Sequence, residues 1–194
     1  MMPLTLRAAL SCHPSTPEPE VDSIEATVSL QDDGSLALAY VLCGRTDSLD
    51  IPRLRPPAFR DGLWRRTCFE VFLKPDAGPA YREFNFSPSG EWAAYGFDDY
   101  RVRNAWRPDG EAATVFERDS DRLWLTARLP HAFFAKAAGS PQMRIALSAV
   151  VQNSDGRLSY WALRHPAGKP DFHHPQAFAA VDDALIFSKE GTGT

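Results

Sequence analysis

Apolar and polar residues alternate in short runs along most of this chain, and proline and glycine interrupt the runs at close intervals. A period of two residues is typical of β-strands that bury one face. Roughly ten such runs, separated by turn signals every 8–12 residues or so, predict a sandwich or a barrel. We therefore expect an all-β fold, an antiparallel β-sandwich of jelly-roll or immunoglobulin-like type, formed by residues 1–194 as a single domain.

The runs predict individual strands, one helix and two long connections. Residues 130–138 are expected to form one short helix, because proline begins the segment and Gly139 follows it. Residues 50–62 contain three prolines and should wrap across a sheet edge or a groove mouth, and residues 98–110 should form a long loop. The expected strands are residues 4–10, 24–30, 36–42, 68–73, 81–86, 91–97, 112–117, 122–129, 143–152, 158–163 and 184–187.

Two central strands carry an unusual polar face. Alternation places Phe84 and Phe86 on one side of their strand and Glu83 and Asn85 on the other, together with Tyr81. In the preceding strand, Glu70 lies on the face opposite Phe69, Val71 and Leu73. Two carboxyl groups and an amide on one strand face are costly to cover without partners. This face predicts a polar ligand groove, in which Glu83 is an exposed carboxylate.

Aromatic and basic residues near this face complete a candidate binding site. Sugars are bound by aromatic rings that stack on C–H surfaces and by planar polar groups that pair with adjacent hydroxyls. Both kinds of side chain occur here. The candidate ligand-binding residues are Trp64, Arg66, Glu70, Tyr81, Glu83, Asn85, Trp92, Arg101, Trp161 and His165.

Two other interpretations of these residues remain open. The tryptophans can be packing residues, and Glu70 and Glu83 can pair with Arg66 and Arg82. Paired carboxylates across a cleft are also what glycoside hydrolysis needs. Glutamates on neighbouring strands are common, however, and a binding face uses them as acceptors, so we expect no catalytic residue.

The spacing of histidine, methionine and cysteine residues argues against metal, haem and thiol chemistry. His173 and His174 are adjacent, so in an extended segment they point opposite ways and seldom bind one metal together. A haem would need an axial pair such as a histidine with Met143, which lies on an apolar strand face. The spacing of Cys12, Cys43 and Cys68 fits neither a disulfide framework nor zinc. We expect no cofactor and no metal.

Composition limits the partners. The chain has 194 residues, a net charge of −4 and no long basic run, so nucleic acid is not an expected partner. No segment approaches the roughly 18 apolar residues of a membrane helix, and the N-terminus lacks the pattern of a signal peptide. From these absences we expect a cytoplasmic protein of unknown oligomeric state.

Longer strings within the chain resemble a known family. The strings WRRTCFEVFL and YREFNFSPSGEWAAY, a following YR pair, and the later YWALRHP and DFHHPQAF are similar to the DOMON-like proteins. These are β-sandwich modules related to the family 9 carbohydrate-binding modules, and the resemblance covers roughly residues 4–187. The wider group includes sugar binders, haem binders and members of unknown role.

The resemblance and the polar face together predict a function. We expect a non-catalytic module that binds a small polar ligand on the concave sheet face, with a carbohydrate or cell-wall sugar favoured by the resemblance. The alternative is a haem- or metal-binding redox module of cytochrome type. A third possibility is an interaction module whose polar face is sealed by the loops.

Overall fold

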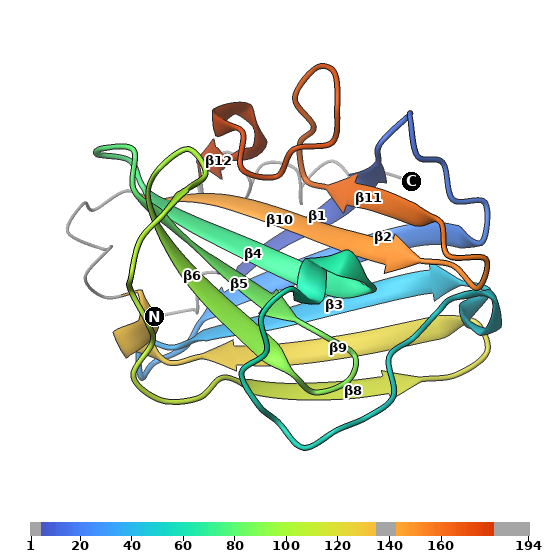
Figure 1. The fold of residues 1–194 in the computed structure, drawn as a ribbon. Coiled ribbons are helices and arrows are strands. Elements are labelled where there is room, and N and C mark those ends of the chain that lie inside the picture. Colours follow the sequence, from blue (N-terminus) through green and yellow to red (C-terminus); the bar gives the residue numbers. More distant parts are fainter. Residues whose placement is uncertain (1–4, 135–142, 181–194) are drawn as a thin grey trace.

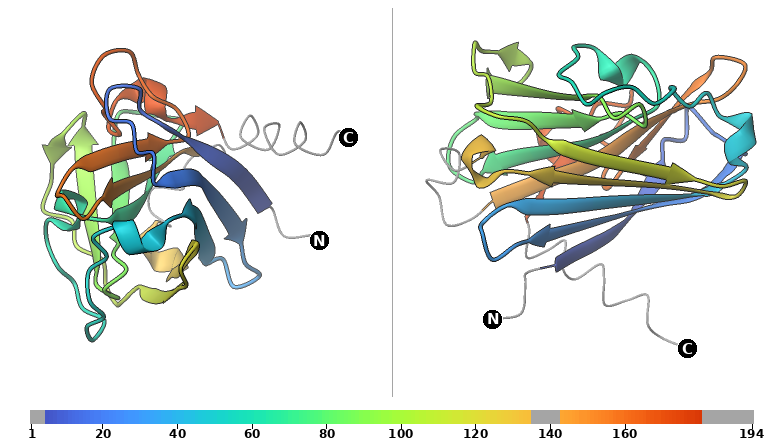
Figure 2. Two further views of the ribbon diagram at one scale, coloured as in Figure 1. Left: turned by 90° about the vertical axis from the view of Figure 1, so that its right-hand side faces the viewer. Right: turned by 90° about the horizontal axis from the view of Figure 1, so that it is seen from below.

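The chain forms two stacked layers of antiparallel strands in the computed structural model, which describes residues 5–134 and 143–180 (Figure 1). Every strand pair is antiparallel, apart from one isolated parallel bridge between Phe59 and Trp92. The predicted all-β sandwich is confirmed. Figure 2 shows the layers from two directions at right angles.

One layer, the first sheet, contains strands that bury one face and expose or half-expose the other. Its order is β8–β9–β3–β2–β1. Leu38, Tyr40 and Leu42 point inward from β3, as their alternation predicts. The bounds are β1 Thr5–Cys12, β2 Val21–Leu30, β3 Leu36–Gly44, β8 Ala113–Arg118 and β9 Arg122–Leu129.

The other layer, the second sheet, is buried on both faces over most of its width. Its order is β7–β6–β5–β4–β10–β11, with β12 beside the start of β10. β1 joins the two layers, because it pairs with β2 over most of its length and with β11 at Ser11 and Cys12. The bounds are β4 Cys68–Pro75, β5 Tyr81–Phe86, β6 Trp92–Asp99, β7 Val102–Arg103, β10 Met143–Gln152, β11 Leu158–Ala162 and β12 Ala179–Ala180.

Only the start of the expected helix lies within the described part of the chain. A single 3₁₀ turn, η3 His131–Phe133, occupies the start of the expected helix, and residues 135–138 lie outside the described part of the chain. The expected strand at residues 184–187 also lies outside it. The other 3₁₀ turns are η1 Thr46–Ser48, η2 Leu63–Arg65 and η4 Pro175–Ala177.

The connections differ from expectation in one place. Residues 98–110 are not entirely a loop, because β7 forms within them and pairs with the end of β6. Residues 50–62 do run along a sheet edge. There Phe59 bridges Trp92, the Arg55 amide donates to the Ser89 carbonyl, and the Arg60 amide donates to the Trp92 carbonyl.

Two apolar clusters lie on opposite sides of the second sheet. The larger cluster fills the space between the layers and includes Phe69, Phe84 and Leu125. The smaller one lies on the outer face of the second sheet, where Phe72 and Tyr95 are buried. The segments that cover this outer face are η2, the β6–β7 turn and the loop that follows β11. They leave a cavity between themselves and the sheet.

Candidate functional site

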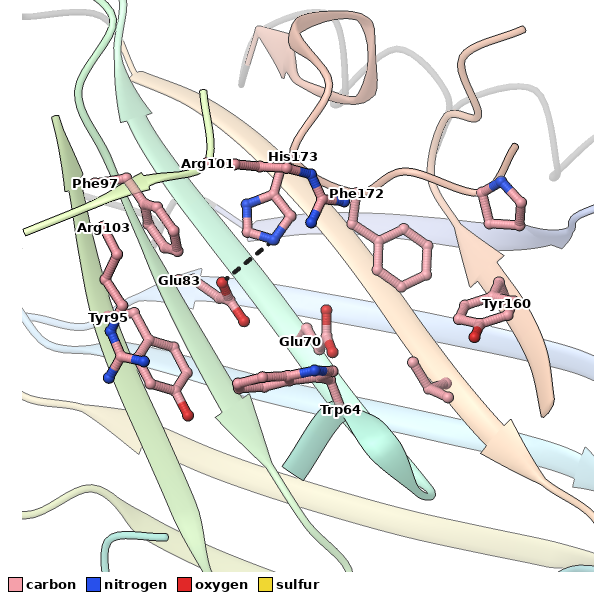
Figure 3. Close-up of a pocket in the computed structure, with 12 residues that line it drawn as sticks. Trp64, Glu70, Glu83, Tyr95, Phe97, Arg101, Arg103, Tyr160, Phe172 and His173 are labelled. Carbon is pink, nitrogen blue, oxygen red and sulfur yellow. Dashed lines mark ion pairs between the residues drawn. The ribbon is translucent and has the colours of Figure 1, made fainter. Parts of the chain in front are cut away.

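A cavity of about 370 Å³ lies on the outer face of the second sheet, beneath the covering segments. Its walls come from η2, from strands β4, β5, β6, β7, β10 and β11, and from the loops after β6 and β11, so no single motif defines it. Figure 3 shows the side chains converging from the sheet below and the loops above. The lining residues are Trp64, Glu70, Glu83, Tyr95, Phe97, Arg101, Arg103, Val150, Tyr160, Pro170, Phe172 and His173.

Strand pairing brings the predicted polar face together. Glu70 of β4 lies opposite Asn85 of β5, and Phe72 lies opposite Glu83. Glu70 and Glu83 are therefore diagonal neighbours on one face. Phe84 and Phe86 face the core between the layers. The sequence prediction that Glu70, Glu83 and Asn85 share one face, opposite the phenylalanines, is confirmed as geometry.

Glu70 is the most isolated polar group of the cavity. It is 2% exposed. Its Oε2 accepts one hydrogen bond, from Ser148 Oγ at 3.3 Å, and its Oε1 is buried without a hydrogen-bond partner. Burial raises the pKa of Glu70 well above its usual range, and the neighbouring Glu83 raises it further. Burial therefore favours the protonated, neutral form of Glu70.

Glu83 is buried as well, at 4% exposure. Its Oε1 accepts a hydrogen bond from Asn85 Nδ2 at 2.8 Å, while Asn85 Oδ1 is buried without a partner. Burial raises the pKa of Glu83 to about 7, although the Asn85 hydrogen bond and the nearby Arg101 act in the opposite direction. The expectation of an exposed groove carboxylate is wrong, because loops distant in sequence cover this strand face.

His173, in the loop that follows β11, contacts Glu83. The two atoms His173 Nε2 and Glu83 Oε2 are 3.7 Å apart, the contact drawn as a dashed line in Figure 3. Burial lowers the pKa of His173 to about 4. The imidazole is therefore neutral near pH 7, and we interpret this contact as polar rather than as a pair of full charges. Tyr81 Oη lies 2.8 Å from His173 Nδ1 and accepts a hydrogen bond from the Arg101 amide.

At the upper rim, Arg101 and Tyr100 both contact Asp171, and we call this group of contacts the clamp. Arg101 Nη2 lies 2.8 Å from Asp171 Oδ1, and the Tyr100 hydroxyl donates to Asp171 Oδ2 at 2.5 Å. These contacts tie the β6–β7 turn to the loop after β11. Arg101 has a φ of 57°, a left-handed conformation that non-glycine residues rarely adopt. Arg101 thus contributes to the rim with its guanidinium and with its backbone.

The opposite wall is aromatic. Trp64, from η2, is 36% exposed and meets the ring of Tyr95 edge to face, with centroids 5.5 Å apart. The Tyr95 hydroxyl donates to Asp61 Oδ1 at 2.7 Å and accepts from the Gly62 amide. The Arg103 guanidinium lies over the Tyr95 ring at 4.1 Å and reaches Asp61 at 3.5 Å. Each rim arginine therefore already has a carboxylate partner.

The structure brings together Glu70, Glu83, Asn85, Tyr81, Trp64 and Arg101, but two predicted tryptophans lie elsewhere. Trp92 is opposite Phe86 and Trp161 is opposite Ala149, so both face the core between the layers. Trp92 packs on Phe59, and Trp161 Nε1 donates to Ser159 Oγ. The expectation that they line the groove is wrong, because strand register turns them inward.

Two other predicted residues are also outside the cavity. Arg66 Nη2 pairs with Asp50 Oδ2 at 2.7 Å, near the surface. His165 lies where β1 meets β11, with Nε2 at 2.8 Å from the Ser11 carbonyl oxygen and its ring against that of His13. The alternative in which Arg66 and Arg82 neutralise the two glutamates is wrong too. Arg82 donates to the Phe133 carbonyl and stacks on Trp106.

The sequence analysis missed eight of the twelve residues that line the cavity. Tyr95 and Phe97 alternate with the inward-facing Ala94, so the period of two in β6 could have revealed them. Tyr160 precedes the inward-facing Trp161 in the same way. Phe172 and His173 lie in an irregular loop with no periodic signal. Their contact with β4 and β5 depends on how that loop crosses the sheet.

The donor set of the described residues gives no metal site. Residues 5–134 and 143–180 contain no group of three or more histidine, cysteine, aspartate or glutamate side chains placed to hold one ion. Cys12, Cys43 and Cys68 are free thiols. His174, unlike His173, turns away and accepts a hydrogen bond from the Gln176 amide through Nδ1. No helix among the described residues is long and apolar enough to cross a membrane.

Comparison with known proteins adds information on the fold. No family model matches the chain, and no curated protein matches it. A crystal structure described as a candidate carbohydrate-binding protein from Bacteroides uniformis ATCC 8492 is 16% identical, with a TM-score of 0.67, covering 91% of this chain and 84% of that one. Domain G2 of mouse nidogen-1 is 10% identical over 81% of this chain and 86% of that one, with a TM-score of 0.15. The chain thus has the fold of the Bacteroides protein, and membership of the DOMON-like group stays a prediction.

Proposed function

We propose that this protein is a non-catalytic binding module for a small polar ligand, with a carbohydrate as the favoured class, and that the ligand occupies the cavity above Glu70 and Glu83. The observation that carries the proposal is Glu70 Oε1, a buried acceptor of a lining residue that has no hydrogen-bond partner. A second unpartnered acceptor, Asn85 Oδ1, belongs to the residue opposite Glu70 on the neighbouring strand. A buried polar atom without a hydrogen bond costs about 1–3 kcal/mol. A ligand with several hydroxyl or amine donors removes that cost.

The walls suit a ring-shaped ligand. Trp64 and Tyr95 offer aromatic surface on one side, and Phe172 and Tyr160 line the other. Aromatic faces stack on the C–H faces of a sugar while planar polar groups below bind its hydroxyls. A cavity of about 370 Å³ is at the small end of the usual range for ligand sites. The similar fold of the Bacteroides protein, which is described as a candidate carbohydrate binder, agrees with this proposal.

Binding fits the two carboxyl groups better than hydrolysis does. Glycosidases need one carboxyl group that is protonated and one that is ionised, so their environments push the two pKa values apart. Here burial raises the pKa of both Glu70 and Glu83. Burial thus disfavours the ionised form of both residues, which favours a role as hydrogen-bonding groups.

Titration calorimetry with a panel of mono- and oligosaccharides tests the proposal. We expect dissociation constants in the micromolar to millimolar range and no new products by chromatography, because one stacking contact and a few hydrogen bonds support no more than that. Trp64→Ala should weaken binding about 2- to 12-fold, the equivalent of 0.5–1.5 kcal/mol for one aromatic contact. Glu117→Gln, an exposed position on β8, is the matched control.

Two results would contradict this function. One is the absence of binding by any sugar of the panel at millimolar concentration. The other is binding that neither Trp64→Ala nor Glu83→Gln weakens, which would place the ligand elsewhere on the molecule. Release of a cleaved product would contradict the non-catalytic part alone.

A further inference from the structure

We infer that the ligand of this cavity carries a primary ammonium group, as an amino sugar does, and that Glu70 and Glu83 bind this cation from below while the aromatic walls enclose it. The inference rests on the proposed function and narrows its ligand class. It follows from the distribution of charge around the cavity, from the unpartnered oxygen on the floor and from the aromatic lining.

The positive side chains at the rim are already matched with carboxylates. Arg101 is paired with Asp171 at 2.8 Å. Arg103 lies between the Tyr95 ring and Asp61, whose Oδ1 is 3.5 Å from its Nη1. A ligand carboxylate or phosphate would have to compete with these partners. The rim therefore gives no reason to expect an anion.

The carboxyl groups on the floor lack such partners. Among the described residues, neither Glu70 nor Glu83 forms an ion pair with a lysine or an arginine. Glu83 contacts the neutral His173 at 3.7 Å and accepts a hydrogen bond from the neutral Asn85 amide. Glu70 Oε1 is buried and unpartnered while its residue lines the cavity. Two carboxyl groups without a cationic partner line one cavity, where a bound cation would stabilise their ionised forms.

The lining supplies the second half of a cation site. An organic cation within about 6 Å of an aromatic ring centre is attracted to the face of the ring, and more strongly when water is excluded. Trp64, Tyr95, Tyr160 and Phe172 surround the same space as the two carboxyl groups. An ammonium group on a sugar ring would contact carboxylate oxygens with its N–H bonds while the ring lies against the aromatic side chains.

Binding of an ammonium group should release protons. In the free protein burial raises the pKa of Glu70 and Glu83 and so favours their protonated forms, whereas a bound cation favours the ionised forms. The groups that face the pair are Cys68 from β4, Tyr81 from β5, Tyr95 from β6, Asp61 from the preceding segment, Arg101 and Arg103 from the β6–β7 region, Tyr160 from β11, and Asp171 and His173 from the following loop. Glu83, whose pKa burial raises to about 7, is the member of the carboxyl pair expected to titrate near neutral pH.

The test compares matched sugars on the full chain. D-glucosamine, D-glucose and N-acetyl-D-glucosamine are titrated at about pH 6.5, below the pKa of about 7.7–8.0 of an α-amino type group, and the galacto and manno series are run in parallel. We expect an amino sugar to bind on the order of 10- to 100-fold more tightly than its neutral counterparts, the range of one charge-assisted hydrogen bond. Repeating the titration in two buffers of different ionisation enthalpy should show net proton release for the amino sugar.

Substitutions locate the effect. Glu70→Gln should bring the affinities of the amino and neutral sugars to within a few-fold of each other, whereas Glu117→Gln should preserve the preference. Circular dichroism checks that each variant is folded. If Glu70→Gln does not fold, the inference is tested with Glu83→Gln, which should reduce the preference for amino sugars, and with the proton-release measurement on the unchanged protein.

The remaining outcomes separate this inference from the proposed function. Neutral sugars that bind as tightly as the amino sugars, with sensitivity to Trp64→Ala, would overturn the ammonium inference and support the carbohydrate function. Binding of benzylammonium without binding of any sugar would keep the cation site and overturn the carbohydrate class. Binding of neither kind of probe would overturn both.

Discussion

The outer faces of the two sheets have similar alternation but different environments. On the first sheet, Glu25, Thr126 and Arg128 point away from the core and are exposed. On the second sheet, Glu70 and Glu83 also point away from the core, yet both are buried. The difference is that connections cover the second sheet, whereas the outward side chains of the first sheet face solvent.

The comparison shows what a polar residue on a strand means in each setting. On the exposed face, a carboxylate keeps its hydration and costs the fold little. On the covered face the same group loses water, and its pKa rises because the charged form is disfavoured. The covering segments therefore remove water from the polar groups of an ordinary alternating strand without giving each of them a partner. For this reason we propose that the ligand binds there.

The largest expected loss of stability comes from truncating an aromatic side chain that lies on the outer face of the second sheet, beneath the covering segments. Phe72 is fully buried on the outer face of β4 and contacts the rings of Tyr81, His173 and Phe178. Phe72→Ala should lower the free energy of unfolding by about 3–5 kcal/mol. Val41→Ala, at an outward, half-buried position of β3, should cost no more than about 1 kcal/mol. Urea unfolding of both variants measures the difference in their free energies of unfolding. Equal losses of stability would contradict the proposed difference between the two outer faces.

A smaller effect is expected from the buried charge. The pKa of Glu83 is raised from 4.5 to about 7, so the folded protein loses stability as the pH rises through this interval. The penalty reaches at most about 3 kcal/mol above pH 7, at 1.36 kcal/mol per pKa unit. Glu83→Gln removes it, so this variant should match the wild type near pH 4 and be more stable near pH 8. Thermal unfolding at several pH values measures the difference.

The exposed Glu25→Gln substitution on β2 is the control for this experiment, with an expected change within about 0.5 kcal/mol at either pH. A Glu83→Gln variant that is less stable than the wild type at pH 8 would show that the ionised carboxylate supports the fold. In that case the charge argument for the cavity would have to be abandoned.

The smallest effect is expected from the contacts of Asp171 with Tyr100 and Arg101, which tie two of the covering segments together. Asp171→Asn weakens the contacts with Tyr100 and Arg101 at the rim. Because Arg101 is about half exposed, we expect a loss of no more than about 1 kcal/mol in global stability. Local opening should be more sensitive, so amide hydrogen exchange should accelerate in residues 99–104 and remain unchanged in β3. Unchanged exchange in residues 99–104 would show that the Asp171 contacts do not hold the β6–β7 turn in place.

Much of the fold was predictable from local pattern. Alternation gave the strands of both sheets and the side to which Glu70, Glu83 and Phe84 point, because successive side chains of a strand leave opposite faces. The inward placement of Trp92 was also accessible. The Ser87–Gly90 turn makes β5 and β6 a hairpin, and its register sets Trp92 opposite Phe86. Our expectation counted aromatic residues near the polar face without applying that register.

Burial of the polar face was decided by tertiary structure alone. His173 lies ninety residues beyond Glu83 in the sequence, in a loop without periodicity, and reaches the cavity only because that loop crosses the second sheet. Strand alternation determines a side chain's direction, which depends on the backbone at that residue. Exposure depends on whether another part of the chain lies above it. The sequence by itself therefore determined the polar face, and the tertiary structure decided that this face became a covered cavity.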